Sequence, residues 1–327
     1  RTTRYETLFP YTTLFRSINI DEPDLSGDPG NPAVKPKPDD VIHILYTSGS
    51  TADPKGVYSS HRNQMHFVKR FTEYLNITPA DTFAYYFSLG FSAHAMPSLG
   101  ILLNGGTLVM YDLKKRGFPG LDDFFQEKGV TICLMIPSVL RHFRSTLKEG
   151  FKFRKLRTLL IGGETLYFSD IKQIRPFLRK NTEIINIYAS TELFLACAYR
   201  IRQETILKQN IIPIGFPVDG MQIDIMDGNG NVCKTGEIGE MSISSRYTAL
   251  GYWNNPQLTM QDYRKDGEIT VFSSRDLAFR HADGSVVHVG RKDAMVKIRG
   301  QRVDLGEIEN TLLANASIQE VAVALKE

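Results

Sequence analysis

Apolar and polar positions follow two different periods along the chain. Residues 41–46, VIHILY, form a short β-branched run that predicts a buried strand leading into a Gly/Ser/Thr loop. Residues 61–75 carry apolar side chains at helical spacing and predict an amphipathic helix. This alternation of strands and helices continues and predicts a layered α/β fold. Further strands are expected at residues 130–134, 156–161 and 184–188, and further helices from Pro137 and at residues 169–179.

The pattern changes after about residue 213, where strands follow one another directly. Residues 221–226 and 238–244 alternate between apolar and polar positions, and the turn sequence DGNGN lies between them. This arrangement predicts a region rich in β-hairpins. Two more short strands are expected from Ser285, followed by a helix at residues 305–315 and a strand at residues 321–325.

The first forty residues differ in character from the rest. Residues 8–17, LFPYTTLFRS, resemble the reading-frame translation of a sequencing adapter, so residues 1–17 are set aside from the fold. The alternative is a natural N-terminal peptide. Residues 18–40 include a stretch rich in Pro, Asp and Gly with few apolar residues, which predicts a linker or surface loop.

Composition narrows the classes of protein that fit. The length of 327 residues allows one large or two medium domains. The net charge is only +3 and no Lys/Arg run is long, so no nucleic-acid partner is expected. No apolar stretch reaches the roughly 18 residues of a membrane helix. The three cysteines, Cys133, Cys197 and Cys233, match no metal-binding spacing, and a reduced, cytoplasmic protein is therefore expected.

The loop after the first strand has the composition of a phosphate-binding segment. Residues 47–56, TSGSTADPKG, offer backbone N–H groups, hydroxyl donors and the charge of Lys55 to an anion such as the phosphates of ATP. An ordinary Ser/Gly turn explains the composition equally well. The segment does not fit the pattern G-x4-G-K-[ST], which argues against a P-loop kinase or GTPase. The candidate phosphate-binding residues are Thr47, Ser48, Gly49, Ser50, Thr51 and Lys55.

Residues 46–57, YTSGSTADPKGV, resemble the phosphate-loop signature YTSGSTGxPKGV of the adenylate-forming superfamily. That superfamily includes acyl-CoA synthetases, luciferases and the adenylation domains of nonribosomal peptide synthetases. The resemblance spans residues 41–327 and continues, in the family's order, at residues 162–164 (GGE), 186–192 (NIYASTE), 272–278 (FSSRDLA) and 290–309 (GRKDAMVKIRGQRVDLGEIE).

The resemblance implies a fold and its domains. We expect a large layered AMP-binding domain at residues 41–292, with mixed sheets flanked by helices and a β-rich subdomain, its N-terminal part missing. Residues 293–327 are expected to start a small, truncated α+β C-terminal domain, with Asp293 as the hinge.

The resemblance also implies roles for individual residues around ATP and Mg²⁺. Tyr188 would stack on adenine, since a flat aromatic ring suits a base. Thr191 would contact the α-phosphate and Glu192 would hold Mg²⁺, since carboxylate oxygens suit that ion. The implied catalytic residues are Thr191, Glu192 and Lys55, and the implied nucleotide contacts further include Gly162, Gly163, Glu164, Asn186, Asp276 and Arg291, the last two at the ribose.

The implied activity is the ATP-dependent activation of a carboxylic acid as an acyl-adenylate, with later transfer to a thiol. The acceptor would be CoA or the phosphopantetheine of an acyl or peptidyl carrier protein. Four positions depart from the family's motifs: Ala52 and Ala189 replace Gly, and Ser274 and Arg275 replace Thr-Gly. Ala52, Ala189 and Arg275 motivate an alternative, a degenerate nucleotide-binding module without catalysis.

Residues 87–108 resemble the segment that shapes the acyl pocket. Ser92 stands where amino-acid-activating members carry an Asp that pairs with the substrate ammonium. A buried ammonium without this partner loses roughly 3–5 kcal/mol, so we expect an apolar acid without an α-amine; the alternative is an alignment that slips by one residue. The expected pocket wall comprises Phe91, Ser92, Ala93, Met96, Leu134, Leu160, Gly162, Ile187, Leu195 and Ala196.

Overall fold

The computed structural model describes residues 35–47, 54–86, 92–202, 205, 210–292, 295–298 and 301–304, and towards the C-terminus residues 308–309, 311–312, 318 and 321–323. The chain divides into two compact units, Arg1–Pro36 and Lys37–Glu327. All described helices and strands belong to the second unit. The segment at residues 1–17 lies outside the described residues, as does most of the expected linker.

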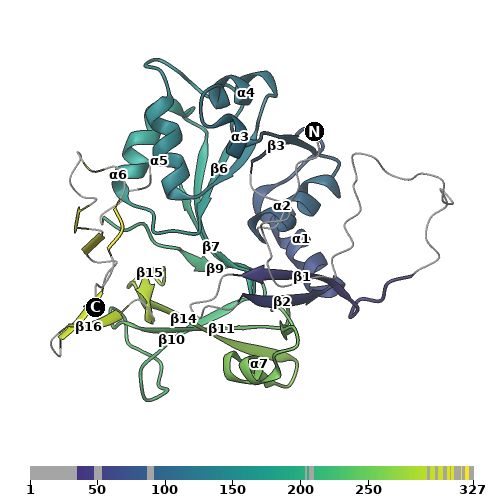
Figure 1. Cartoon of the computed structure of the whole chain (residues 1–327), viewed down its shortest axis with the longest axis vertical. Helices are drawn as coiled ribbons and strands as arrows, with labels where there is room; N and C mark the ends of the chain where they lie inside the picture. The colour runs from purple at the N-terminus through teal and green to yellow at the C-terminus, as the bar shows by residue number, and fades with distance from the viewer. Residues whose placement is uncertain are drawn as a thin grey trace. The chain divides into compact units, whose positions relative to one another are not determined.

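A seven-stranded mixed sheet is the largest sheet of this unit (Figure 1). Its strand order is β4-β3-β5-β6-β7-β8-β9. The first five of these strands run parallel, whereas β8 and β9 are antiparallel additions at one edge. The strands are β3 (Thr82–Tyr85), β4 (Thr107–Met110), β5 (Ile132–Met135), β6 (Thr158–Gly162), β7 (Glu183–Ser190), β8 (Phe194–Ile201) and β9 (Phe216–Pro217).

The helices cover both faces of the sheet because successive strand side chains point to opposite faces. Leu134 and Leu160 join a buried cluster with α1, whereas Met135 and Ile161 join a second cluster with α4, α5 and α6. The helices are α1 (His61–Leu75), α2 (Ser92–Leu102), α3 (Leu113–Arg116), α4 (Leu121–Glu127), α5 (Pro137–Thr146), α6 (Phe168–Ile174) and α7 (Pro256–Asp262).

A β-rich region follows in sequence and is built around the long strand β14. This strand of 12 residues pairs with β11, β13 and β15. A smaller sheet has the order β1-β2-β12, and β16 pairs with β17. The strands are β1 (Val41–Thr47), β2 (Lys55–Ser60), β10 (Gln222–Met226), β11 (Gly239–Ser245), β12 (Gly251–Tyr252), β13 (Tyr263–Asp266), β14 (Ile269–Arg280), β15 (Val286–Arg291), β16 (Met295–Ile298) and β17 (Gln301–Asp304).

A buried ion pair ties the amino ends of the parallel strands together. Asp81, 3% exposed, precedes β3 and accepts hydrogen bonds from Arg157, which precedes β6, at 2.7 and 2.9 Å. It also accepts one from the hydroxyl of Thr131, which precedes β5, at 2.8 Å. The opposite, carboxyl ends of the strands are therefore the ends that remain for a ligand site, as is usual in open α/β sheets.

The predicted α/β class, with mixed sheets flanked by helices and a β-rich region, is confirmed. The helix predicted at residues 61–75 has those bounds. The helix predicted at residues 169–179 ends early, because Pro176 lacks an N–H and a short 3-10 turn, Arg175–Phe177, replaces its second half. Among the described residues, no helix has both the length and the apolar character that a membrane crossing requires.

The described residues near the C-terminus agree only in part with the elements expected there. Of the helix expected at residues 305–315, the described residues 308–309 and 311–312 are helical. The strand expected at residues 321–325 is wrong for its described residues 321–323, which form no strand. The N–H of Val323 donates instead to the carboxylate of Glu309 at 2.8 Å.

Candidate functional site

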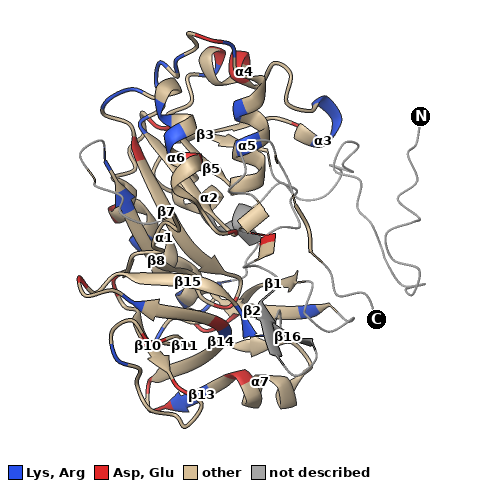
Figure 2. Cartoon of the chain, turned by 90° about the vertical axis from the view of Figure 1, so that its left-hand side faces the viewer, with Lys and Arg blue, Asp and Glu red and all other residues tan. Residues whose placement is uncertain are grey.

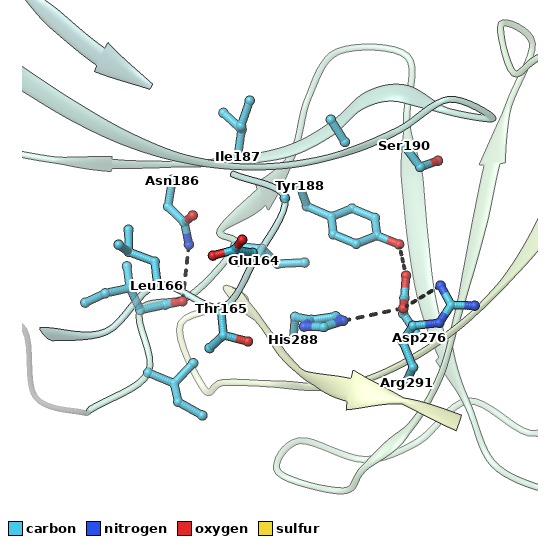
Figure 3. A pocket seen from close by; sticks show the side chains of 15 residues that line it. Glu164, Thr165, Leu166, Asn186, Ile187, Tyr188, Ser190, Asp276, His288 and Arg291 are labelled. Atoms are coloured by element: carbon cyan, nitrogen blue, oxygen red, sulfur yellow. Dashed lines mark hydrogen bonds and ion pairs between the residues drawn. The ribbon is translucent and has the colours of Figure 1, made fainter. Parts of the chain in front are cut away.

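A cavity of about 240 Å³ lies at the carboxyl ends of β6 and β7, where these strands meet β14 and β15 (Figure 3). Five short pieces of chain, far apart in sequence, contribute to its wall. The lining residues are Gly163, Glu164, Thr165, Leu166, Asn186, Ile187, Tyr188, Ala189, Ser190, Ile211, Ile212, Ile214, Asp276, His288 and Arg291.

Gly162 allows the segment after β6 to pass close to β7. A Cβ atom at this position would lie 2.6 Å from Cγ1 and 2.7 Å from the carbonyl oxygen of Ile187, closer than side chains pack. Gly163 follows with a φ of 89°, a left-handed conformation that glycine adopts readily. The expected glycines therefore set the path of this wall of the cavity through their backbone.

Four polar side chains meet on the other side of the cavity. Asp276, 8% exposed, accepts a hydrogen bond from the hydroxyl of Tyr188. Its Oδ1 also lies 3.4 Å from Nη1 of Arg291 and 3.5 Å from Nε2 of His288, and Figure 3 shows these three side chains converging on the carboxylate. Burial, and then the charge of Asp276, raise the pKa of Tyr188 well above its ordinary value, so its hydroxyl stays a neutral donor.

His288 is the member of this group that sequence reasoning missed. The signal lies in strand pairing, because β14 and β15 pair with Asp276 opposite Arg291 and Ala278 opposite His288. Both β15 side chains therefore face the carboxylate, but the register is not visible in the sequence alone.

Asn186 and Glu164, both expected at the nucleotide, are engaged with protein groups. The amide nitrogen of Asn186 donates to the carbonyl oxygens of Ile212 and Pro213, at 3.3 and 2.8 Å, and so holds one wall of the cavity. The carboxylate of Glu164 accepts from the backbone N–H and the hydroxyl of Ser138, at 2.9 and 2.7 Å. It thereby caps the start of α5, whose own N-cap residue, Ile136, has no side chain that accepts a hydrogen bond.

Glu192 belongs to a second polar cluster next to the cavity. It lies in the turn between β7 and β8, which closes with Phe194 at a φ of 59°. The hydroxyl of Tyr252 lies 3.3 Å from Oε1 of Glu192 and 3.2 Å from Oδ2 of Asp262. Nζ of Lys55 lies 5.6 Å from the centre of the Tyr252 ring, within reach of a cation–π interaction. Lys55 pairs with Thr47 across β1 and β2, and Thr191 is buried beside Glu192.

The strand β14 connects the two clusters. Arg275, the neighbour of Asp276, has a φ of 62° and donates through Nη2 to Oδ1 of Asp262 at 2.8 Å. The charge of Glu192 contributes to the raised pKa of Tyr188, although less than burial and Asp276 do. Tyr188 and Asp276 thus line the cavity, and Glu192 and Lys55 meet at Tyr252 in the neighbouring cluster. In the described part of the chain, no group of three or more His, Cys, Asp or Glu side chains is arranged to hold a metal ion.

The described residues of the expected acyl pocket gather in one buried cluster at the large sheet. Leu134, Leu160, Leu195 and Ala196 are at most 6% exposed and share one buried cluster, against which Ile187 packs. Gly162 pairs with Ile187 in the register of β6 and β7. Of the other expected residues, Ser92, Ala93 and Met96 lie on α2, whose first side chains are outside the described ones, and Ser48, Gly49, Ser50, Thr51, Phe91 and Asp293 are outside the described residues altogether.

Comparison with known proteins identifies the family. Residues 9–253 match the family described as AMP-binding enzyme. The chain belongs to this family. The match begins inside the segment set aside as adapter-like, whose origin stays a prediction.

Individual members of the family resemble the chain over most of its length. Bacitracin synthase 3 of Bacillus licheniformis is 33% identical over 88% of this chain. The L-proline–[L-prolyl-carrier protein] ligase of Streptomyces coelicolor is 32% identical over 88% of this chain. The chain spans only 4% of the first of these relatives and 54% of the second.

A solved structure supports the fold of this AMP-binding enzyme. The crystal structure of CmiS6 matches 78% of this chain and 62% of its own, with a TM-score of 0.71 and 24% identity. At this identity the likeness concerns the fold alone, and it agrees with the layered α/β architecture.

Proposed function

We propose that this AMP-binding enzyme uses ATP to convert a carboxylic acid into an acyl-adenylate. The observation that carries the proposal is the meeting of Tyr188, Asp276, Arg291 and Gly163 around one cavity, with Glu192 and Lys55 in the adjoining cluster. An aromatic face, a carboxylate with two acceptor oxygens and a nearby cation match a base, a ribose and a phosphate chain in that order.

The size of the cavity suits part of a nucleotide. Its volume of about 240 Å³ is somewhat below the roughly 300–1,000 Å³ of typical ligand pockets. We therefore assign the adenosine to the cavity and the phosphates to the region of Lys55, Thr191 and the loop that begins after Thr47. Asp276 is assigned to the ribose hydroxyls, with Arg291 beside it.

Catalysis would rest on charge neutralisation and positioning. The substrate carboxylate attacks the α-phosphorus of ATP, the bond to the bridging oxygen breaks, and pyrophosphate leaves. Lys55 and Thr191 would stabilise negative charge on the phosphate oxygens, where one well-placed group is worth on the order of 10²–10³ in rate. Glu192 fits Mg²⁺, which proteins hold through one or two carboxylates together with substrate phosphates; when bound, the ion supplies further charge neutralisation.

The acid and the acceptor are further parts of the proposal. Ser92, in place of the acidic partner of a substrate ammonium, supports an apolar acid without an α-amine, held against Leu134, Leu160, Ile187, Leu195 and Ala196. The name of the Streptomyces relative supports a carrier protein as the thiol that accepts the acyl group; CoA is the other candidate. We further propose a domain boundary after residue 292 and a hinge at Asp293.

ATP–pyrophosphate exchange on the full-length gene product, with a panel of fatty, aryl, keto and amino acids, tests the proposal. We expect exchange with at least one acid that lacks an α-amine. Glu192→Gln should lower this exchange by about 10²-fold or more. Binding of ATP without exchange for any acid would favour the degenerate module, which the motif departures at Ala52, Ala189 and Arg275 suggest. Absence of ATP binding would overturn both.

A further inference from the structure

The cluster behind Glu192 contains three side chains to which the proposed chemistry gives no role. Tyr252 and Asp262 are each 5% exposed, and Arg275 reaches Asp262 from β14. Figure 2 colours the positions of the charged residues on the ribbon of the chain. In this ion pair the side chain of Asp262 is only 6% exposed. Buried charges are costly unless they are paired, so the arrangement needs a reason.

The hydroxyl of Tyr252 lies between two carboxylates at nearly equal distances, 3.3 Å to Glu192 and 3.2 Å to Asp262. A tyrosine hydroxyl has one hydrogen and therefore donates to only one of them at a time. The stronger negative charge attracts that hydrogen. The positive charge of Arg275, at 2.8 Å, offsets the negative charge of the Asp262 carboxylate. Asp262 therefore attracts the hydroxyl hydrogen of Tyr252 less strongly than an unpaired carboxylate would.

We propose that Tyr252 is a positioning residue for the carboxylate of Glu192, and that the Asp262–Arg275 pair keeps its hydrogen bond directed to Glu192. The inference rests on the proposed function, in which Glu192 holds Mg²⁺ with the phosphates of ATP. Hydrogen bonds to a metal-binding carboxylate fix its orientation, and their loss typically lowers metal affinity about 10- to 100-fold. Arg275 stands at the glycine position of the family's motif. Through Asp262 and then Tyr252, its side chain acts on the carboxylate of Glu192.

The test measures ATP affinity in Mg²⁺ and in EDTA, for example by calorimetry, on the full-length protein. The dissociation constant in EDTA divided by the dissociation constant in Mg²⁺ measures how much the metal ion strengthens ATP binding. Tyr252→Phe is expected to reduce this ratio about tenfold while the value in EDTA stays within about twofold. A purely structural role for Tyr252 would weaken binding equally in both conditions, and this outcome would overturn the proposal.

A pair of variants tests the role of the ion pair. Arg275→Gly leaves Asp262 uncompensated, so Tyr252 turns to it and the ratio falls as in Tyr252→Phe. Adding Asp262→Asn removes the competing charge, and the ratio is expected to recover to within about threefold of wild type. A double variant as impaired as Arg275→Gly alone would contradict the mechanism.

Tyr263 provides the matched control. It is 8% exposed and its ring packs on that of Tyr252, at 5.6 Å between centroids, but its hydroxyl has no hydrogen-bond partner in the part of the chain that the structure describes. Tyr263→Phe should leave the ratio unchanged; an effect equal to that of Tyr252→Phe would count against a specific role for Tyr252. If wild type shows no Mg²⁺-dependent gain in ATP affinity, the proposed metal role of Glu192 fails first, and this inference fails with it.

Discussion

At the scale of residues, Glu164 and Asp276 show how side chains at one cavity divide between binding and support. The carboxylate of Asp276 collects Tyr188, His288 and Arg291 at the cavity. The carboxylate of Glu164 is bound to Ser138, 26 positions earlier in the chain, where it caps α5. A family motif places both residues near the nucleotide, but it does not say which of them is free to bind it.

Glu164→Ala is expected to lower the free energy of unfolding by about 1 kcal/mol, because the first turn of α5 loses the carboxylate that caps it. ATP affinity should stay within about twofold, since the substitution keeps the backbone of the cavity wall. Urea unfolding measures the first quantity and calorimetry the second. Glu164→Gln keeps the acceptor and loses the charge, so it should lie between wild type and Glu164→Ala. A large loss of affinity with unchanged stability would show instead that Glu164 contacts the nucleotide.

At the scale of elements, the two ends of the parallel strands have different roles. The amino ends of β3, β5 and β6 are joined through Asp81, Thr131 and Arg157. The carboxyl ends of β6 and β7 carry the cavity. Stability and binding should therefore respond to different substitutions.

Asp81 makes the stability of the folded chain depend on pH. Burial alone would raise the pKa of Asp81, but hydrogen bonds from Arg157, Thr131 and the N–H of Thr78 outweigh it and lower the pKa to about 2. Because this value lies below the 3.8 of the ordinary carboxyl, the ionised carboxylate of Asp81 stabilises the folded state fully above about pH 5. This stabilisation is lost as the pH falls through 3.8 towards 2. Its contribution is about 2 kcal/mol.

Asp81→Asn should therefore lower stability near pH 7 by at least about 2 kcal/mol, and flatten its dependence on pH between 5 and 2. Urea midpoints as a function of pH measure both effects. Glu268→Gln, which breaks the exposed ion pair with Arg246, is the matched control and should change little. A pH dependence that survives in Asp81→Asn would assign acid sensitivity to other carboxylates.

At the scale of the whole molecule, the cavity joins two sheets. Its walls come from β6 and β7 of the seven-stranded sheet and from β14 and β15 of the β-rich region. A ligand that contacts both sheets stabilises the folded state without binding the unfolded chain. Binding should therefore be visible as thermal stabilisation.

ATP at 100 times its dissociation constant should add about 2.7 kcal/mol to the free energy of unfolding, seen as a rise in Tm. Since Asp276 is proposed to hold the ribose hydroxyls, 2′,3′-dideoxy-ATP at the same concentration should raise the Tm of wild type less. Asp276→Asn should respond weakly and almost equally to both nucleotides. A variant that still distinguishes them would remove Asp276 from the ribose site.

The sequence predicted the elements whose character is local. Residues 61–75 have a strong helical period, and β1 a compact apolar run, so both were found within one residue. The strand β14 was missed because polar and charged residues, Ser273 to Asp276, interrupt its middle. Within this stretch Ser273 pairs with Ser242 of β11 and Asp276 pairs with Arg291 of β15, so pairing with strands distant in sequence places these residues in the sheet.

The candidate site was predictable where motifs are continuous and hidden where it depends on folding. Tyr188, Glu192 and Asp276 were named from motifs, and the structure brings them together. His288 and Tyr252 were not named, since strand register brings the first to Asp276 and a contact across 60 positions brings the second to Glu192. Neither relation leaves a local pattern.

The conformation of Arg275 has a consequence for protein engineering. Consensus design replaces unusual residues by the commonest one of the family, and here it would restore glycine. Glycine suits a φ of 62° better than arginine does, yet the exchange would strand the carboxylate of Asp262 inside the protein. Replacing Arg275 alone or Asp262 alone brings no improvement, so a search that tests one substitution at a time rejects both. The consensus glycine becomes acceptable only when Arg275 and Asp262 are exchanged together.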